Sequence, residues 1–435
     1  MVKQIVFIIA LLITLGVFAY TISKIINNFK LTKANFPIKN IGKRFKNMLK
    51  VAFGQTKIFR RPVIGLMHAI VFWGFCVILF GSIEMVIDGV GRLERSLGVL
   101  GGFYDFMIAF GDIFALLIAI SIIAFLIRRI FMHIPRFSGI EMKKKSHQDA
   151  NVALTLILLL MISLLGLNSA YVHLKAVTGT PSVGVFPVSN YLSDILYANA
   201  SVHQLHIWHD IFWWMHILLI FLFANILPYS KHFHVFLSVP NTFLVRLEPL
   251  GKLTNMDEIT KEVKLMLDPN AAFDTSEPPA EIQRFGVKDV TDISWKNYFD
   301  SLTCTECGRC TSVCPANITG KKLSPRKIMM DVRARMKEKG NVVSKKGKEF
   351  DDGKSLLRDY ISEEEIWACV TCNACANECP VNINQPTLIV DIRRYLVMEE
   401  SAAPTGLNTM FSNIENNGAP WQYSPEDRLL WTENM

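Results

Sequence analysis

The cysteines of this chain follow a repeated spacing that constrains the fold more than any other feature. Eight of the nine form two copies of C-x2-C-x2-C-x3-C-P, at Cys304, Cys307, Cys310 and Cys314 and at Cys369, Cys372, Cys375 and Cys379. This spacing is typical of two cubane [4Fe–4S] clusters, in which three close cysteines bind one cluster and the fourth binds the other. The two segments are therefore expected to fold around each other.

The same rule predicts a ligand set for each cluster. The first set is Cys304, Cys307, Cys310 and Cys379, and the second is Cys369, Cys372, Cys375 and Cys314. Zinc is an alternative, but it needs only four ligands and does not favour a third cysteine at equal spacing. Disulfides are disfavoured because the topology predicted below places this segment in the reducing cytoplasm. We expect the ninth cysteine, Cys76, to be a small buried hydrophobe in an apolar run.

Apolar residues are concentrated in the first half of the chain. The 435 residues are 51% hydrophobic, which is high for a soluble protein, and the second half is ordinary and polar. Five apolar segments are each long enough to cross ~30 Å of hydrocarbon as a helix. They span roughly residues 5–25, 64–86, 106–127, 153–172 and 207–227. The first lacks a small-residue cleavage site and its basic residues follow the apolar run, so we interpret it as a retained span and not a signal peptide.

The basic residues predict how these spans are oriented. Eleven Lys and Arg and no acidic residue lie between residues 24 and 61, and six basic residues lie between 128 and 145. The opposite loops, 88–105 and 173–206, are nearly neutral. The positive-inside rule places the N-terminus outside and the cysteine motifs in the cytoplasm, as in a multi-pass protein of the bacterial cytoplasmic membrane. The net charge of +8 thus indicates topology and not a nucleic-acid partner. Binding of anionic lipid by the basic loops is compatible with this interpretation.

Histidines inside spans are candidate functional residues because ionisable groups are costly there. His68 lies near the cytoplasmic end of the second span, and His216 and His234 are 18 residues apart on the fifth. Eighteen residues are five helical turns, which places both on one helix face if Pro228 does not bend the helix. His232 falls on the opposite face. His68 and His234 then share one depth, and two facing imidazoles predict a b-type haem.

A second haem lacks an obvious ligand pair. His216 needs a partner about ten residues beyond His68, and that position is Ile78. His209 precedes His216 on the same helix and is too far along it to bind from the opposite side. A ligand from another span, a five-coordinate haem and the absence of a second haem all stay open.

Two acidic residues lie inside predicted spans. Asp112 is in the middle of the third, and Glu84 is near the outer end of the second. A buried acid can handle protons at a quinone site or hydrogen-bond to its neighbours. The sequence does not favour one role over the other.

The fold class predicted for the whole chain is all-α. A five-helix transmembrane cytochrome b bundle occupies 1–240, a connector at the membrane surface 241–295, an α-helical two-cluster ferredoxin domain 296–400, and a tail 401–435. In the cluster domain we expect helices from Pro325 to about 339 and from Gln385 to about 399, and a capping box at Ser362 and Glu365. The tail either docks a partner or is an ordinary chain end.

These motifs resemble those of known families. The membrane half resembles the gamma subunit of respiratory nitrate reductase, a five-helix cytochrome b, at His68 and at His216 and His234 on either side of residues 228–231. The second half resembles the ferredoxin-like part of heterodisulfide-reductase-related proteins. Nearly the whole chain resembles membrane electron-transfer-flavoprotein:menaquinone oxidoreductases, at residues 213–216, 228–234, 304–310, 319–325, 367–372 and 413–421.

The resemblance implies an oxidoreductase subunit that carries electrons between a cytoplasmic electron-transfer flavoprotein or dehydrogenase and menaquinone, through two [4Fe–4S] clusters and haem b. Such proteins continue into a cysteine-rich domain with Cys-Cys-Gly motifs, and this chain reaches Met435 about where that domain begins. The resemblance therefore implies a separate iron–sulfur partner subunit of this type. One alternative is the reverse flow, from quinol to a disulfide. Another is a structural membrane anchor whose haem has no function.

Overall fold

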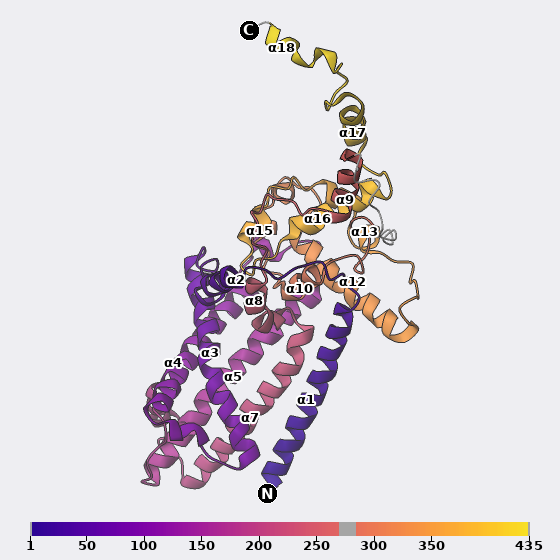
Figure 1. Ribbon diagram of the computed structural model, residues 1–435. Coiled ribbons are helices and arrows are strands. Elements are labelled where there is room, and N and C mark those ends of the chain that lie inside the picture. The colour runs from indigo at the N-terminus through magenta and orange to yellow at the C-terminus, as the bar shows by residue number, and fades with distance from the viewer. Residues whose placement is uncertain (1, 269–283, 434–435) are drawn as a thin grey trace.

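A bundle of five long helices carries a second helical domain at one of its ends (Figure 1). The structure, a computed structural model, describes residues 2–268 and 284–433. The long helices are α1 (Val2–Phe29), α3 (Pro62–Gly91), α4 (Gly102–Phe131), α5 (Lys144–Val177) and α7 (Val202–Ile226). Each of the five is long and apolar enough to cross a membrane, which confirms the predicted spans. The described residues contain no β-strand.

Each long helix is longer than the apolar segment predicted from the sequence, because polar residues at its ends are also helical. Pro62 occupies the first turn of α3. Proline fits there because an N–H in the first turn has no partner within the helix. Ser201 and Gln204 form a capping box at the start of α7. The central helix is α5, in which 50% of the residues in the apolar stretch are buried. In the peripheral α1 the share is 11%. Cys76 is exposed on the outer face of the bundle, so the prediction of a buried side chain is wrong.

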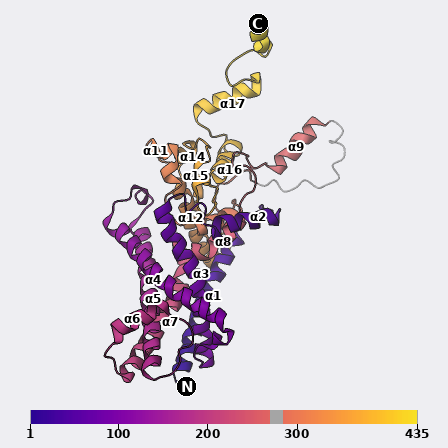
Figure 2. The same ribbon diagram turned by 90° about the vertical axis from the view of Figure 1, so that its left-hand side faces the viewer.

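Short helices mark the two ends of the bundle. α6 (Pro187–Tyr197) lies at the end that carries the N-terminus, whereas α2 (Ile41–Met48) and α8 (His234–Phe243) lie at the opposite end, under the second domain (Figures 1 and 2). The N-terminus and the cysteine motifs are thus at opposite ends of the bundle. The side of the membrane that each end faces stays a prediction.

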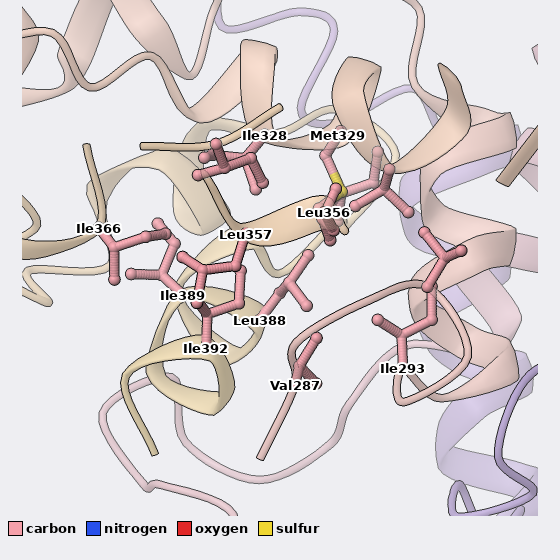
Figure 3. Close-up of a cluster of buried hydrophobic side chains, with 14 of the residues drawn as sticks. Val287, Ile293, Ile328, Met329, Leu356, Leu357, Ile366, Leu388, Ile389 and Ile392 are labelled. Atoms are coloured by element: carbon pink, nitrogen blue, oxygen red, sulfur yellow. The ribbon is translucent and has the colours of Figure 1, made fainter. Parts of the chain in front are cut away.

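The second domain is built from one long helix, α12 (Pro325–Lys346), and several short ones around one apolar core. The others are α10 (Trp295–Thr303), α11 (Pro315–Ile318), α13 (Leu356–Asp359), α14 (Glu363–Trp367), α15 (Ala374–Glu378) and α16 (Gln385–Met398). Figure 3 shows Ile328 and Met329 of α12 in the same core as Leu388 and Ile389 of α16. All four side chains are buried, and each stabilises the domain by roughly 1.5–3 kcal/mol.

Contacts with loops of the bundle fix this domain in place. Arg326, at the start of α12, is 1% exposed and pairs with Glu141 at 2.7 Å. The same guanidinium donates to the carbonyl of Arg136 at 2.6 Å. On the other side, Lys57 donates to the carbonyl of Cys379 at 3.0 Å, and Arg60 to that of Asn377 at 2.9 Å. The basic loops predicted from sequence therefore form the docking surface for the second domain.

The remaining segments lie outside both cores. α9 (Asp257–Leu267) projects from the second domain (Figure 2). Thr254, in the segment before it, accepts a bond of 3.0 Å from Arg394. Residues 269–283 of the predicted connector lie outside the described residues. The tail helices α17 (Thr405–Asn417) and α18 (Leu430–Glu433) extend away from the body (Figure 1). α12 continues past its predicted end near residue 339 and stops before Gly347, whose φ is +90°.

Candidate cofactor sites

The two cysteine motifs have the same backbone conformation. Glu306 and Thr371, two residues after the first cysteine of each motif, have φ of +55° and +52°. Gly308 and Asn373, four residues after it, have φ of +71° and +59°. These left-handed residues reverse the direction of the backbone within each loop, so that the cysteines of one motif can face a common point.

The fold brings Cys304, Cys307, Cys310 and Cys379 together. Burial raises the pKa of Cys310 well above its usual value, and the adjacent thiols of the other three raise it further. Burial likewise raises the pKa of Cys304 to about 11 and that of Cys379 to about 12. Thiols held this way become thiolates only with a cation among them, which is the environment that an iron–sulfur cluster provides. The donor set therefore fits the first predicted cluster.

The second predicted set also converges. Cys314, Cys369, Cys372 and Cys375 line one small enclosed cavity. Burial raises the pKa of Cys375 to about 12, and the other three thiols contribute in the same direction. Cys310 and Cys375 are near enough to influence each other, so the two sets are adjacent. The assignment of each cysteine to its cluster stays a prediction, which this grouping supports.

A large cavity connects the interior of the bundle with the first cysteine set. It has a volume of about 510 Å³, within the ~300–1,000 Å³ typical of cofactor sites. Its walls are mainly apolar side chains of α3, α5 and α7, and His68, His216, His232 and His234 also line it. Cys307 lines the end nearest the second domain. One cavity thus contacts both the predicted haem histidines and a predicted cluster ligand.

Two of these histidines are oriented as metal ligands usually are. Nδ1 of His234 lies 3.0 Å from the carbonyl oxygen of Lys231, and Nδ1 of His216 lies 3.0 Å from that of Leu160. A ring that donates from Nδ1 to a carbonyl presents the lone pair of Nε2 to a metal. Nδ1 of His68 is buried without a hydrogen-bond partner among the described residues. The histidines therefore fit a haem, and their role as ligands stays a prediction.

The expectation that His216 and His234 share one helix is wrong. α7 ends at Ile226, and two 3-10 turns follow, at Leu227–Tyr229 and Lys231–Phe233, before α8 begins at His234. Pro228 interrupts the helix because it has no N–H to donate and its ring crowds the preceding turn. The turns also bring His232 to the cavity wall, opposite to its predicted orientation.

Lys231 joins the histidine turn to the first cysteine motif. Its backbone carbonyl accepts the bond from His234, and its ammonium group lies 3.1 Å from Glu306, which stands between Cys304 and Cys307. Both side chains are buried, at 7% and 8% exposed. Arg333 also pairs with Glu306. Burial lowers the pKa of Lys231, and Glu306 opposes this effect.

A smaller cavity lies on the other side of His216. Its volume is about 130 Å³, and His209, Glu84 and Asp112 line it. Ile78 and His216 line both cavities, in agreement with the position predicted for Ile78 opposite His216. His209 and His216 both come from α7, and no second imidazole faces them from another helix in the part of this cavity that the structure describes.

The two membrane acids already have several partners. Asp112 accepts bonds of 2.8 Å from the backbone N–H groups of Val188 and Ser189, in the first turn of α6. This is the geometry of a helix cap supplied by another helix. Glu84 accepts bonds of 3.0 Å from the N–H of Leu97 and from the hydroxyl of Tyr104. These bonds favour the neighbour-bonding role that the sequence left open for both acids.

Sequence reasoning missed the charged wall of the large cavity. Arg61, Arg129, Arg136 and Arg309 line it, as does Lys231. The sequence does not distinguish the basic residues that face the cavity from those that only indicate membrane topology. A cavity-facing role follows only from the folded position.

Comparisons with known proteins identify the cysteine region. The description "4Fe-4S dicluster domain" matches residues 303–383, so the chain contains such a domain. No solved structure matches the chain. The match agrees with the predicted two-cluster region and contains all eight motif cysteines.

Curated relatives cover most of the chain. The "Probable iron-sulfur-binding oxidoreductase FadF" of Bacillus subtilis is 29% identical over 90% of this chain and 56% of its own length. The "EtfAB:quinone oxidoreductase" of Syntrophomonas wolfei is 26% identical over 97% of this chain and 58% of its own length. One subunit of a heterodisulfide reductase of Methanosarcina mazei is 29% identical over 33% of this chain and 35% of its own length. The chain thus spans less than two thirds of these relatives, whose names agree with the predicted oxidoreductase subunit.

Proposed function

We propose that this protein is a membrane electron-transfer subunit that links a cytoplasmic donor to menaquinone. When bound, two [4Fe–4S] clusters and a haem b supply the one-electron chemistry. His68 and His234 hold the haem in the large cavity, His216 is a further candidate ligand, and the eight motif cysteines hold the clusters. The observation that carries the proposal is that one cavity is lined by these histidines and by Cys307.

The chain's own residues position and insulate these groups. Apolar side chains of α3, α5 and α7 exclude water from the cavity, and the carbonyl of Lys231 orients His234. Glu84 lies buried beside the smaller cavity, where it is the candidate residue for holding a proton near a quinone. Asp112, which lines the same cavity and caps α6, is a second candidate.

The partners follow from the resemblance and from the relatives. The name of the Syntrophomonas relative combines an electron-transfer flavoprotein with a quinone, which supports a flavoprotein or dehydrogenase as donor. We propose a cysteine-rich iron–sulfur partner of the Cys-Cys-Gly type between this donor and the exposed Cys372. The reverse flow, from quinol to a disulfide, is the second candidate, because the Methanosarcina relative belongs to a heterodisulfide reductase.

An optical experiment tests the proposal. The full chain is purified in detergent, reduced gently, and mixed anaerobically with a menaquinone analogue while the haem α-band is followed. We expect a reducible b-type haem that the quinone re-oxidises promptly. A protein without haem, or with a haem that ignores the quinone, would contradict the proposed function.

A further inference from the structure

The end of the large cavity nearest the second domain gathers positive charge. Its lining includes four arginines and Lys231, and Glu306 is the one acidic residue among the lining that the structure describes. Glu306 is already paired with Lys231 at 3.1 Å, and Arg309 is paired with Glu378 at 2.7 Å. The other three arginines, Arg61, Arg129 and Arg136, form no ion pair among residues 2–268 and 284–433. We call these three residues the arginine end.

Two of the three guanidinium groups converge on one aromatic ring. The guanidinium carbons of Arg129 and Arg136 each lie 5.1 Å from the ring centroid of Phe137. Asn151 holds Arg129 in position by accepting a bond of 3.0 Å from its Nε. The two guanidiniums are thus neighbours on the cavity wall, although they come from α4 and from the loop after it.

The arginine end is also incompletely bonded. Nη2 of Arg129 and Nε of Arg136 are buried and have no hydrogen-bond partner among the described residues. Burial lowers the pKa of Arg136 to about 10, and the nearby charges of Arg61, Arg128 and Arg309 act in the same direction. The charges of Glu306 and Asp149 act on Arg129, but they give these two buried atoms no acceptor. A buried donor without an acceptor is unfavourable. An anion in the cavity would supply the missing acceptor.

A carboxylate suits these donors, because hydrogen bonds from a guanidinium to an ionised oxygen are short and strong. The remainder of the cavity wall is largely apolar. A suitable ligand is therefore a large apolar molecule with two carboxylates at one edge, which describes haem b. We propose that Arg129 and Arg136 bind the two carboxylates of the haem, and that Arg61 adds to the positive field. The identity of the ligand rests on the proposed function.

Anionic lipid has related chemistry, since a phosphate would also accept from these arginines. Arg128 provides the contrast within the same segment. Its guanidinium carbon lies 5.9 Å from the Phe137 centroid, but Arg128 does not line the cavity. The unbonded atoms of Arg129 and Arg136 are buried, so they suit a ligand inside the cavity better than a lipid at its rim.

Blocked carboxylates provide the test. The full chain is produced in haem-deficient cells, purified in detergent, and titrated with haem b and with its dimethyl ester. We expect the wild-type protein to bind the free acid roughly tenfold or more tightly than the ester, as loss of charge-assisted hydrogen bonds predicts. The double variant Arg129→Gln/Arg136→Gln should bind both forms alike. The matched control Arg128→Gln, which removes a charge next to the cavity, should behave as wild type.

The outcomes separate this inference from the proposed function. If the wild-type protein binds haem and its ester equally well, the arginine end does not bind carboxylates and the inference is wrong, while the proposed function stands. If it binds neither, both are wrong. If esterification has no effect but removal of phosphatidylglycerol lowers haem affinity, the arginines serve lipid instead. The wild-type comparison needs no variant, so a variant that fails to fold does not affect it.

Discussion

The two cysteine motifs have the same spacing and the same left-handed residues, but they lie in different surroundings. In the first set, Cys304, Cys310 and Cys379 are buried, and Cys307 lines the large cavity that enters the bundle. In the second set, Cys372 is exposed, and the neighbouring Val370 is 65% exposed. The motif alone therefore provides two sites, and the packing of the domain on the bundle gives them different neighbours. This difference predicts an order, with the second site toward a soluble partner and the first toward the membrane.

Replacing one predicted cysteine ligand in each set tests this order, and of the variants that compare the two sites we expect it to change cluster re-oxidation most. Cys310→Ser and Cys372→Ser should each leave one cluster, counted by electron paramagnetic resonance of the reduced protein. In Cys372→Ser the surviving first cluster should still be re-oxidised by a menaquinone analogue. In Cys310→Ser the surviving second cluster should stay reduced, because it has lost its neighbour on the membrane side. Equal re-oxidation in both variants would show that the sites do not act in series.

The buried pair of Lys231 and Glu306 lies beside the first site, and its removal should be costly. Lys231→Met leaves Glu306 buried with Arg333 as its remaining ionic partner. We expect a loss of about 3 kcal/mol in stability, at the lower end for a broken buried pair. The loss of stability is measured by heating the protein and following the decrease in cluster absorbance.

A surface pair on the second side is the control for this change. Lys322 and Glu364 form an ion pair whose side chains are 63% and 56% exposed. Lys322→Met should leave the melting curve unchanged, because exposed pairs are screened by solvent. If both lysine variants melt alike, the buried pair does not hold the first site on the bundle.

Gly308 and Asn373 are equivalent left-handed positions of the two motifs, and alanine at each should have a smaller effect on stability. A Cβ on Gly308 would lie 2.3 Å from the carbonyl oxygen of Arg136, so Gly308→Ala must move the domain off the loop it contacts. Asn373, at the same position of the second motif, has φ of +59°. We expect Gly308→Ala to cost about 2–3 kcal/mol and Asn373→Ala about 1 kcal/mol. Chemical denaturation of the two variants compares them, and a larger loss at Asn373 would contradict the docking geometry.

Features fixed by local sequence could be predicted, and features that depend on packing could not. The spans follow from the length of the apolar runs, and the helix starts at Pro325 and Gln385 and the capping box at Ser362 follow from local hydrogen bonding. The break after α7 was missed because the sequence shows that Pro228 can bend a helix but not by how much. The cavity-facing Arg61, Arg129 and Arg136 were missed because the same residues also set topology.

We propose that a haem held by His234 is the route by which electrons leave the clusters. The most direct measurement reduces wild-type and His234→Ala proteins fully, mixes each with a menaquinone analogue in a stopped-flow instrument, and follows cluster absorbance. We expect the wild-type clusters to re-oxidise together with the haem, and the clusters of His234→Ala to be present but to stay reduced. Clusters that re-oxidise equally fast in His234→Ala would contradict it.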